Sequence, residues 1–479
     1  MRTPVAQGQP FSLTGREQGR LSERLGKAAA RARRSGRATL AAITVPLPED
    51  VDPAAVACAS RREGEPWFCF EQPDRGRRAL GALGMALELR AAGGDRFREI
   101  AERWRELNAH GFADPSDGSH AAGPLAVGGL SFAPDGGRSP QWRGFGPASL
   151  VVPEISLARG GGGSGVTLCA LVEPDDDTEQ VLERLLGRLA ELRREPLPLL
   201  DPAPTGRFEV LSAMPPQHYE QAVARAVELI RAGTMRKIVL SREVQVHAPR
   251  AHDPAAVFGV LRDEFPACFV FCVGRGDSTL IAASPELLVR REGQRVSTLA
   301  LAASSRRSAD PAVDAHLGEQ LLRDPSYREE HAIVARRIAR ILRPHSVWVA
   351  ASPEPELARI ANIQHLATPI RAQLAAPIDA LELAGLMHPT PAVGGEPLAA
   401  AAPMIPALEG LDRGWYLGPV GWTDAAGDGE FCVALRCALL NGAVARCYAG
   451  GGIVRDSVPE KELAETEVKL AALLPLLAG

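Results

Sequence analysis

Strand-like and helix-like segments are mixed along this chain without a regular order. Short apolar segments divided by Gly and Pro, such as ATLAAITVPLP and GVTLCALVEP, predict strands, and amphipathic segments at residues 77 to 108 and 178 to 194 predict helices. We find no βαβ repeat and no internal period of roughly 20 to 50 residues. The pattern therefore predicts an α+β fold, in which helices pack on a mixed sheet, and argues against a Rossmann unit or a solenoid.

A proline-rich segment separates two halves of the chain that differ in their pattern of predicted strands and helices. Residues 194 to 208, REPLPLLDPAPTGRF, interrupt both the helical and the strand periodicity. After this segment a helical pattern, HYEQAVARAVELIRAG, leads into a long strand pattern, RKIVLSREVQV. We therefore predict an N-terminal α/β region over residues 1 to 205 that packs on a second region, residues 206 to 479, which carries the chemically distinctive motifs.

Composition and charge narrow the class of partner. The chain has 479 residues, 46% of them hydrophobic, which is enough to bury a large core. Its formal net charge of -4 is small and both signs are interspersed, which argues against nucleic acid or a membrane surface as the main partner. No apolar run approaches the roughly 18 residues of a membrane span, and the N-terminal residues do not resemble a leader. We expect a cytoplasmic protein with a small-molecule ligand.

Cysteines and a basic segment have simple structural explanations. The eight cysteines form no CxxC pair and most lie in apolar segments such as FCVALRCALL, so we expect buried, reduced thiols rather than zinc ligands or disulfides. Residues 20 to 37 carry basic side chains at helical spacing. We interpret them as the solvated face of a helix.

The segment ELAETEVK, residues 462 to 469, places acidic and basic groups on one helical face. At about 100° per residue, Glu462, Glu465 and Lys469 lie close together around the helix axis. Ser457 and Glu460 have the spacing of a capping box, which predicts that the helix begins there. The pattern fits either a solvated surface with an i,i+4 ion pair or the wall of a polar site.

A second acidic residue opens another predicted helix. Glu330 and His331 precede an apolar helical face in SYREEHAIVARRIARIL. Alone, Glu330 fits the exposed first turns of a helix. One carboxylate from each of two helices would also suit Mg²⁺, which takes a few protein oxygens and keeps positions for water and an anionic ligand.

A predicted hairpin brings an arginine near a run of glycines. Asn441-Gly442 lies between two apolar segments and predicts a tight turn. A two-residue loop at these positions would pair Leu440 with Ala443 and hence Arg436 with Cys447. The arginine would then lie beside Gly450 to Gly452 and, with their amides, suit a carboxylate. The alternative is an arginine that extends from an edge strand into solvent.

Lys237 and Glu286 form a candidate acid–base pair. Lys237 opens the strand pattern KIVLSREV, and Glu286 follows a proline in ASPELLV. Either residue fits an ordinary charged strand end. In a partly dry cavity, however, desolvation would favour the neutral form of both, giving a base and an acid that suit the transfer of a hydroxyl group.

Together these segments resemble the chorismate-utilising enzymes, the family that contains isochorismate, salicylate, anthranilate and aminodeoxychorismate synthases. The resemblance covers about residues 215 to 475. The motifs that carry it occur in the family's order: KIVLSREV, ASPELLVRREG, EEHAIVARRI, IQHLATPI, LMHPTPAVGGEP, RGWYLGPVGW, FCVALRCALL, YAGGGIV and ELAETEVK. It implies the family's α+β fold, with two stacked antiparallel sheet regions and surrounding helices. IQHLATPI and the long N-terminal half resemble isochorismate synthases most.

The resemblance implies a role for each matched residue. Lys237 would be the general base for attack of water at C2 of chorismate, and Glu286 the general acid for the C4 hydroxyl. Mg²⁺ would be the cofactor and would bind the ring carboxylate. The metal ligands would be Glu330 and Glu465, with Glu462 beside them. The residues around the substrate would be His365, Arg436, Tyr448, Gly450, Gly452, Lys469, Ala303 and Ser304.

Comparison within the family separates its branches. The amide-forming members lack a lysine at the position of Lys237, so its presence favours water as the nucleophile. Ala302 stands where aminodeoxychorismate synthases often carry a nucleophilic lysine, which argues against that branch. Ala303 departs from the family, which usually has Gly at this turn, so the added methyl would crowd the site or require an unusual backbone angle.

Two alternatives to an isochorismate synthase stay open. A salicylate synthase would use the same residues and then eliminate pyruvate, and a chorismate-binding protein without turnover would be consistent with Ala303. Family members are often monomers, so we expect a monomer whose partners are chorismate and enzymes that use isochorismate. The sequence does not decide whether the product would feed menaquinone, siderophore or salicylate synthesis.

Overall fold

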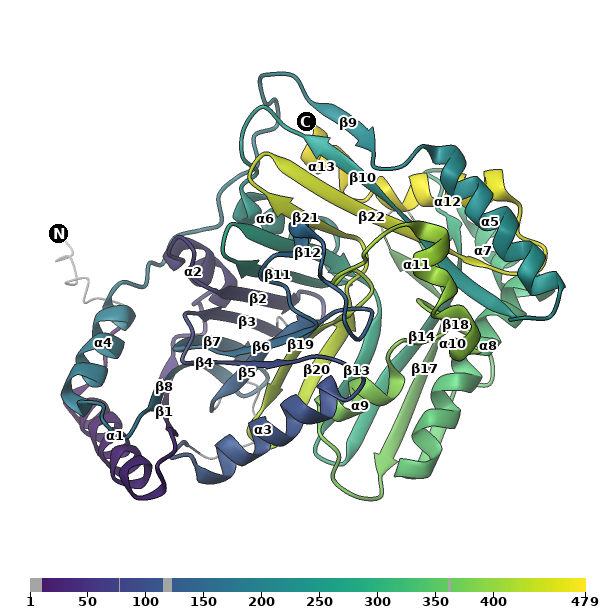
Figure 1. Cartoon of the computed structure of the whole chain (residues 1–479). Coiled ribbons are helices and arrows are strands. Elements are labelled where there is room, and N and C mark those ends of the chain that lie inside the picture. The colour runs from purple at the N-terminus through teal and green to yellow at the C-terminus, as the bar shows by residue number, and fades with distance from the viewer. Residues whose placement is uncertain (1–10, 77, 115–122, 361–362) are drawn as a thin grey trace.

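Two large antiparallel sheets with helices on their outer sides form the molecule (Figure 1). The computed structural model describes residues 11–76, 78–114, 123–360 and 363–479. The helices are α1 Gly15–Ser35, α2 Pro53–Ser60, α3 Arg96–His110, α4 Thr178–Ala190, α5 Pro216–Arg231, α6 Pro254–Glu264, α7 Pro311–Arg323, α8 Pro325–Leu342, α9 Ala380–Met387, α10 Leu398–Ala401, α11 Met404–Glu409, α12 Pro459–Leu470 and α13 Leu474–Ala478. The α+β class and the two antiparallel sheets are as the family resemblance implied, whereas the mixed sheet expected from the strand and helix pattern is wrong, because the paired strands are antiparallel.

The first sheet runs along one side of the molecule. Its strands, in spatial order, are β1 Thr39–Leu47, β8 Gly163–Val172, β7 Ile155–Gly160, β3 Arg78–Leu83, β2 Trp67–Gln72, β11 Phe269–Arg275, β12 Ser278–Ser284, β21 Cys437–Asn441, β22 Val444–Ile453, β10 Lys237–His247 and β18 Gly395–Glu396, and β9 Glu209–Ser212 also pairs with β10.

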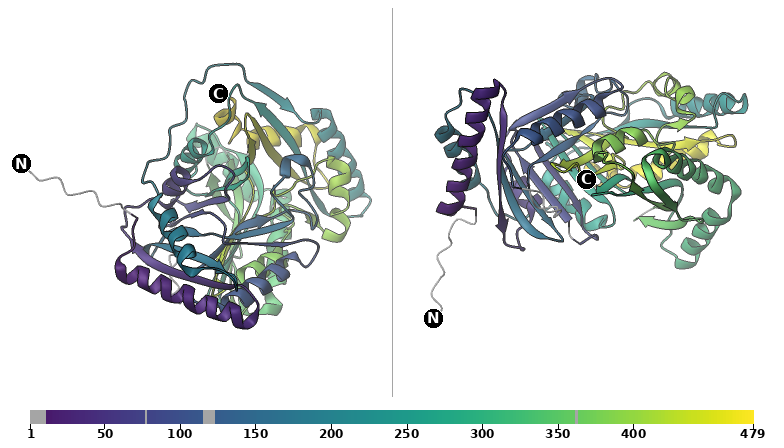
Figure 2. Two further views of the ribbon diagram at one scale, coloured as in Figure 1. Left: turned by 60° about the vertical axis from the view of Figure 1, so that its left-hand side comes forward. Right: turned by 90° about the horizontal axis from the view of Figure 1, so that it is seen from below.

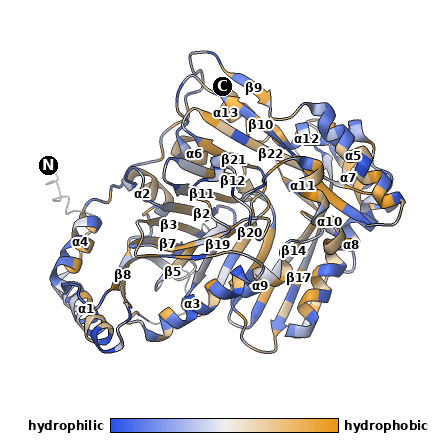
Figure 3. Cartoon of the chain, viewed as in Figure 1, coloured by the Kyte–Doolittle hydropathy of each residue, from blue (hydrophilic) through white to orange (hydrophobic). Residues whose placement is uncertain are grey.

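The second sheet packs against the first. Its order is β15 Ser346–Ala351, β17 Ile363–Leu374, β14 Arg295–Arg306, β13 Leu287–Glu292, β20 Gly429–Val433, β19 Pro419–Asp424, β5 Leu125–Leu130, β6 Ala148–Val152 and β4 Leu87–Ala91, and β16 Glu356–Ile360 also pairs with β17. The largest core cluster fills the space between the sheets, and a second cluster lies between the first sheet and α1, α2, α4 and α6. Figure 3 shows the apolar strands inside and the polar faces of α1 and α8 outside.

Each sheet joins a block of strands from the first half of the chain to a block from the second half. In the first sheet β2 pairs with β11, placing Phe70 opposite Phe271. In the second, β5 pairs with β19, placing Val127 opposite Trp422. The proline-rich segment at residues 194 to 208 contains neither helix nor strand. The division into regions at residue 205 stays a prediction, because hydrogen-bonded sheets cross it.

Local sequence explains the helix that later contributes to the site. Asp324 precedes α8 and accepts a hydrogen bond from the amide of Ser326, and Pro325 occupies the first helical turn. Val334, Ile338 and neighbouring apolar side chains are buried against β14 and β17. One face of α8 is therefore buried against the second sheet, and the opposite face is not part of that packing.

Two local predictions were wrong in detail. Residues 78–83 and 87–91 are strands rather than helix, because Gly84 takes a φ of 74°, which interrupts a helix, and α3 begins only at Arg96. In the C-terminal hairpin Asn441 pairs with Val444 and Ala438 with Cys447, so the turn is Gly442-Ala443. Gly442 alone has a positive φ, which fits a turn with Gly at its first central position.

The predicted capping box is also absent. The N-cap of α12 is Val458, with no side-chain cap, and Pro459 begins the helix. The hydroxyl of Ser457 instead accepts a hydrogen bond from the amide of Val454. The helix itself is present over the segment that was expected.

Other expectations agree with the structure. All eight cysteines are buried and free, and the basic N-terminal segment forms α1 along the outer strands of the first sheet (Figure 2). No helix in the described part of the chain has the length and apolarity needed to cross a membrane. The expectation that no leader is present concerns residues 1–10 in part, and these lie outside the described residues.

Candidate active site

A cavity lies where β10 and β22 of the first sheet face β14 and β17 of the second. α12 packs on β22, and α8 packs on β14 (Figure 1). The residues that line the cavity include Val239, Pro285, Glu286, Ala302, Ala303, Ser304, His365, Ala392, Tyr416, Leu417, Arg436, Tyr448, Gly450, Gly451, Gly452 and Lys469. Residues from eight of the nine motifs that carry the family resemblance therefore meet at one place.

The first region of the site contains a buried lysine and a buried carboxyl group. Lys237, the first residue of β10, is only 1% exposed, and its Nζ donates a hydrogen bond to Oε1 of Glu330 at 2.8 Å. Glu286 lies between β12 and β13 and is 4% exposed. Burial raises the pKa of Glu286 to about 8, although the charges of Lys237 and Arg436 oppose the shift. Glu286 is thus a protonated carboxyl near neutral pH.

The second region contains carboxylates from α12. Burial alone would raise the pKa of Glu465, but Lys469 and Ser304 more than offset it and hold the pKa below its usual value. Oε1 of Glu465 lies 2.5 Å from Nζ of Lys469 and accepts a hydrogen bond from the Ser304 hydroxyl at 2.8 Å. One turn earlier, burial and then the charge of Glu465 raise the pKa of Glu462 to about 7.

Glycines on β22 make room for these carboxylates. A Cβ atom at Gly451 would lie 2.9 Å from Oε2 of Glu462, and one at Gly452 would lie 2.7 Å from Oε1 of Glu330. Both distances are too short for a side chain to be accepted without movement. The glycine run is extended backbone paired with β10, and its small residues let acidic groups approach the strand.

The acidic groups are near one another but each is held by a lysine or a hydroxyl. The charge of Glu330 contributes to the raised pKa of Glu462, as does that of Glu465. Within the described residues, no three His, Cys, Asp or Glu side chains are already arranged to hold a metal ion. Carboxylate oxygens are nevertheless the donors that a hard cation such as Mg²⁺ prefers, so the donor set fits this class of ion.

A third part of the site suits an anion and an aromatic ring. Arg436 is buried, with a φ of 46°, and its Nη2 lies 3.4 Å from Nε2 of His365. Burial and the charges of Arg436 and Lys469 keep the pKa of His365 well below its usual value, so the ring is neutral. Nζ of Lys469 also donates to the carbonyl of Gly450 at 2.8 Å.

Aromatic rings form one wall. Tyr448 stacks between Trp142 and Tyr416, with ring centroids 5.8 and 5.0 Å apart. Sequence reasoning named Tyr448 but not Trp142 or Tyr416. The only signal for Tyr416 was its place in the motif RGWYLGPVGW, and Trp142 reaches the wall from a distant part of the chain.

Ala303 occupies a strained position in the wall of the cavity. It lies at an irregularity in the pairing of β14 with β17, between Ala302 and Ser304, and has a φ of 57°. An L-residue in this region costs roughly 1–2 kcal/mol relative to its usual conformations, whereas Gly does not. The expected unusual backbone angle is therefore present.

The structure brings the predicted site residues together from distant parts of the sequence. All of the predicted substrate-binding residues line the cavity, and Glu286 lines it too. Lys237, Glu330, Glu462 and Glu465 adjoin it through the contacts described above. Their catalytic, substrate-binding and metal-binding roles stay predictions.

Known proteins resemble this chain over nearly its whole length. A family model described as "Chorismate binding enzyme" matches residues 27–478. The chain is 37% identical over 435 residues to a salicylate biosynthesis isochorismate synthase from Pseudomonas aeruginosa, covering 90% of this chain and 89% of the relative. It is 33% identical over 394 residues to isochorismate synthase MenF of Bacillus subtilis, covering 80% and 82%.

Solved structures show the same fold. The menaquinone-specific isochorismate synthase MenF of Escherichia coli superposes with a TM-score of 0.77 at 26% identity, covering 95% of this chain and 99% of the other. Anthranilate synthase component I of Streptococcus pneumoniae gives a TM-score of 0.65 at 23% identity, covering 82% and 91%. The second likeness supports the fold alone.

Proposed function

We propose that this chain, which belongs to the chorismate-binding enzyme family, has the activity of an isochorismate synthase. Water would add at C2 of chorismate, the ring double bonds would shift, and the C4 hydroxyl would leave as water. Relatives covering most of the chain carry this activity in their names. The reaction needs one group that removes a proton from the attacking water and one that gives a proton to the departing oxygen.

The observation that carries the proposal is that Lys237 and Glu286, a buried amine and a buried carboxyl group, lie at the same cavity. Lys237 is buried and has Glu330 as a proton-accepting partner at 2.8 Å, and Glu286 holds a proton because burial raises its pKa to about 8. Lys237 would be the general base and Glu286 the general acid. Each role is typically worth about 10² to 10⁴ in rate.

The remaining residues would hold a dianionic substrate. Arg436 supplies a buried guanidinium, and Lys469 a second cation beside Gly450. Neutral His365 and the stacked ring of Tyr448 give the cavity a flat wall for the substrate ring. Two anionic groups would thus be balanced before the weakly nucleophilic water reacts.

Mg²⁺ is part of the proposal as the cofactor. Glu330 and Glu465 would hold it, with Glu462 close by, since their charges already influence one another. When bound, Mg²⁺ would neutralise the ring carboxylate of the substrate. Glu330 would then serve both regions of the site, because the same carboxylate accepts the hydrogen bond of Lys237.

The direct test is identification of the product. Purified protein would be incubated with chorismate and Mg²⁺, and the products separated by chromatography. Isochorismate without pyruvate is the expected result. No conversion, with stoichiometric binding of chorismate, would instead identify a binding protein.

Salicylate synthase is the second candidate, favoured by one relative named for salicylate biosynthesis. It would form isochorismate at the same residues and then release pyruvate. Equal amounts of salicylate and pyruvate in the same assay would establish it. A cytoplasmic location and a monomeric state stay predictions.

A further inference from the structure

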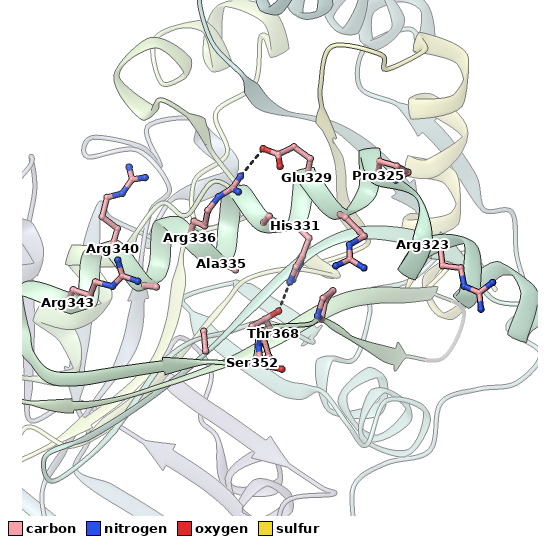
Figure 4. Close-up of a pocket in the computed structure, with 16 residues that line it drawn as sticks. Arg323, Pro325, Glu329, His331, Ala335, Arg336, Arg340, Arg343, Ser352 and Thr368 are labelled. Atoms are coloured by element: carbon pink, nitrogen blue, oxygen red, sulfur yellow. Dashed lines mark hydrogen bonds and ion pairs between the residues drawn. The ribbon is translucent and has the colours of Figure 1, made fainter.

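A basic groove lies on the outward face of α8, away from the proposed active site (Figure 4). Its volume is about 910 Å³. α8 forms one side, and the turn between β15 and β16, from Ser352 to Pro355, forms the other. Five arginines line it: Arg323, Arg328, Arg336, Arg340 and Arg343.

The groove and the active site use different faces of the same helix. At about 100° per residue, Ala332, Ala335 and Ala339 lie roughly 140° to 200° around the helix axis from Glu330. These alanines line the groove, whereas Glu330 bonds Lys237. A ligand in the groove would therefore not occupy the proposed chorismate site.

The floor of the groove is small and uncharged, and its rim is cationic. The alanines recur at one-turn spacing, and His331 and Thr368 close the floor with a hydrogen bond of 2.7 Å (Figure 4). A helix C-terminus by itself favours cations nearby. This preference explains the arginines but not the alanines, whose small side chains leave space between the arginines and the opposite wall of the groove.

Two of the arginines carry unbalanced charge. Arg336 pairs with Glu329 at 2.8 Å and Arg328 with Glu354 at 2.5 Å, and Arg323 lies 3.7 Å from Glu319. Arg340 and Arg343 form no ion pair with any residue that the structure describes. The end of the groove nearest the C-terminus of α8 is thus the most attractive to an anion.

The length of the groove indicates a polymer rather than a small anion. α8 has 18 residues, so it extends about 27 Å at roughly 1.5 Å per residue. A small dicarboxylate would contact only part of this row, whereas about eight residues of extended polypeptide, at roughly 3.3 Å each, would span it.

The neighbouring edge strand also favours a polypeptide. β15 is the end strand of the second sheet in the described part of the chain. Its Val347 and Trp348 are 67% and 45% exposed, which is unusual for large apolar side chains on one short strand. An open strand edge beside a basic groove offers both backbone hydrogen bonds and charge to an extended chain.

We propose that this groove binds an acidic, extended segment of a partner protein. Arg340 and Arg343 would pair with its carboxylates, and the alanine floor would accept its small or apolar side chains. The overall net charge of -4 disfavours a longer polyanion such as RNA, which would meet repulsion beyond the groove. The proposal does not depend on the proposed catalytic activity.

Binding would be measured by fluorescence anisotropy with full-length protein and a labelled peptide of about eight residues that alternates Glu and Val. The unchanged protein should bind it, and more salt should weaken binding. In the double variant Arg340→Glu/Arg343→Glu, binding should weaken by about 30-fold, because two attractive pairs become repulsive. Chorismate turnover should stay unchanged, and the melting temperature should fall by only a few degrees, because two acidic residues then lie at the C-terminus of α8.

A matched control reverses two arginines elsewhere. Arg16 and Arg34 are exposed on α1, at the other end of the molecule from α8 (Figure 1). Arg16→Glu/Arg34→Glu changes the net charge equally and should leave peptide binding within about twofold, since only long-range attraction is lost. Equal weakening in both variants would show non-specific attraction and overturn the proposal.

Other ligands give distinct outcomes. Absence of peptide binding to the unchanged protein would overturn the proposal, as would unchanged binding in a folded Arg340→Glu/Arg343→Glu variant. Displacement of the peptide by malonate at equal carboxylate concentration would identify a small-anion site instead. Tighter binding of a single-stranded RNA oligonucleotide than of the peptide would identify a nucleic-acid surface.

Discussion

Glu286 and Glu465 lie in two regions of one site, and the pKa values of these two buried carboxyl groups shift in opposite directions. Burial raises the pKa of Glu286 to about 8. The pKa of Glu465 lies below its usual value, because Lys469 contacts it at 2.5 Å and Ser304 donates to it. Among the described residues, no side chain donates a hydrogen bond to the Glu286 carboxyl group.

The difference shows that direct contacts, rather than residue type, divide the chemical roles. Lys237 and Arg436 act on Glu286 only through their charge, so desolvation dominates and the proton is kept. Lys469, one turn away, and the Ser304 hydroxyl contact Glu465 directly and keep it ionised. One region is therefore prepared to donate a proton, and the other to bind a cation.

Removal of the lysine from the proton-transfer region should have the largest effect. In Lys237→Ala, turnover of chorismate should fall by about 10³-fold or more, because water loses its base. Chorismate binding in the presence of Mg²⁺ should stay largely intact. Steady-state kinetics and calorimetric titration would measure the two effects, and near-normal turnover would show that the base is misassigned.

Replacement of the acid tests the same region from the other side. In Glu286→Gln, the rate should fall by about 10²-fold, since an amide of similar shape cannot protonate the leaving oxygen. The comparison of kcat with KM is informative, because mainly kcat should change. A change confined to KM would indicate a substrate contact instead of proton transfer.

The carboxylate region should respond to metal concentration. In Glu465→Gln, the Mg²⁺ concentration for half-maximal activity should rise by about 10- to 100-fold, because a charged ligand is lost. Activity would be titrated against Mg²⁺, with Glu467→Gln on the same helix as the control. An unchanged Mg²⁺ requirement would contradict the proposed ligand role.

The raised pKa of Glu286 predicts a pH dependence for both rate and stability. Activity should fall about tenfold per pH unit above a pH of about 8, as Glu286 loses its proton. Folding favours the protonated form, so this contribution to the free energy of unfolding is complete below a pH of about 4.5 and is lost as the pH rises to about 8.

Rate profiles and denaturation at several pH values would check this prediction. In Glu286→Gln, the decrease in unfolding free energy over that interval should become smaller. A decrease of the same size in the variant would assign it to other groups, such as Glu462, whose pKa is also raised.

Relief of backbone strain should have the smallest effect. Ala303→Gly removes a methyl group from a residue with a φ of 57°, and should raise the free energy of unfolding by about 1 kcal/mol. Turnover should rise by no more than a few-fold, because no charged group changes. Ala302→Gly next to it is the control and should not stabilise the protein.

Local patterns predicted much of the fold. The periodicities around residues 237, 330 and 465 identified β10, α8 and α12, because burial of one face leaves a regular apolar pattern. The register of the last hairpin was wrong by one position, since Asn441-Gly442 and Gly442-Ala443 are both tight-turn sequences and only the strand pairing decides.

The site required information that spacing does not hold. Glu330 and Glu465 are more than a hundred residues apart, and their proximity was expected from the family resemblance rather than from any pattern. The contributions of Trp142 and Tyr416 were not predicted, because sheet pairings between distant strands bring them to Tyr448. The basic groove was missed because arginines on a helix usually indicate only a solvated face.

The hydrogen-bonded junction between early and late strands in each sheet sets a limit on how far this enzyme can be shortened. A fragment that began after the proline-rich segment would leave β11 without β2 and β19 without β5. Both sheets would then expose a long, apolar, unpaired strand edge, and such edges pair with other chains and cause aggregation. The residues of the proposed chemistry follow the proline-rich segment, but the strands before it cover the apolar edges of both sheets. The two halves of the chain should therefore be expressed together for the protein to stay soluble.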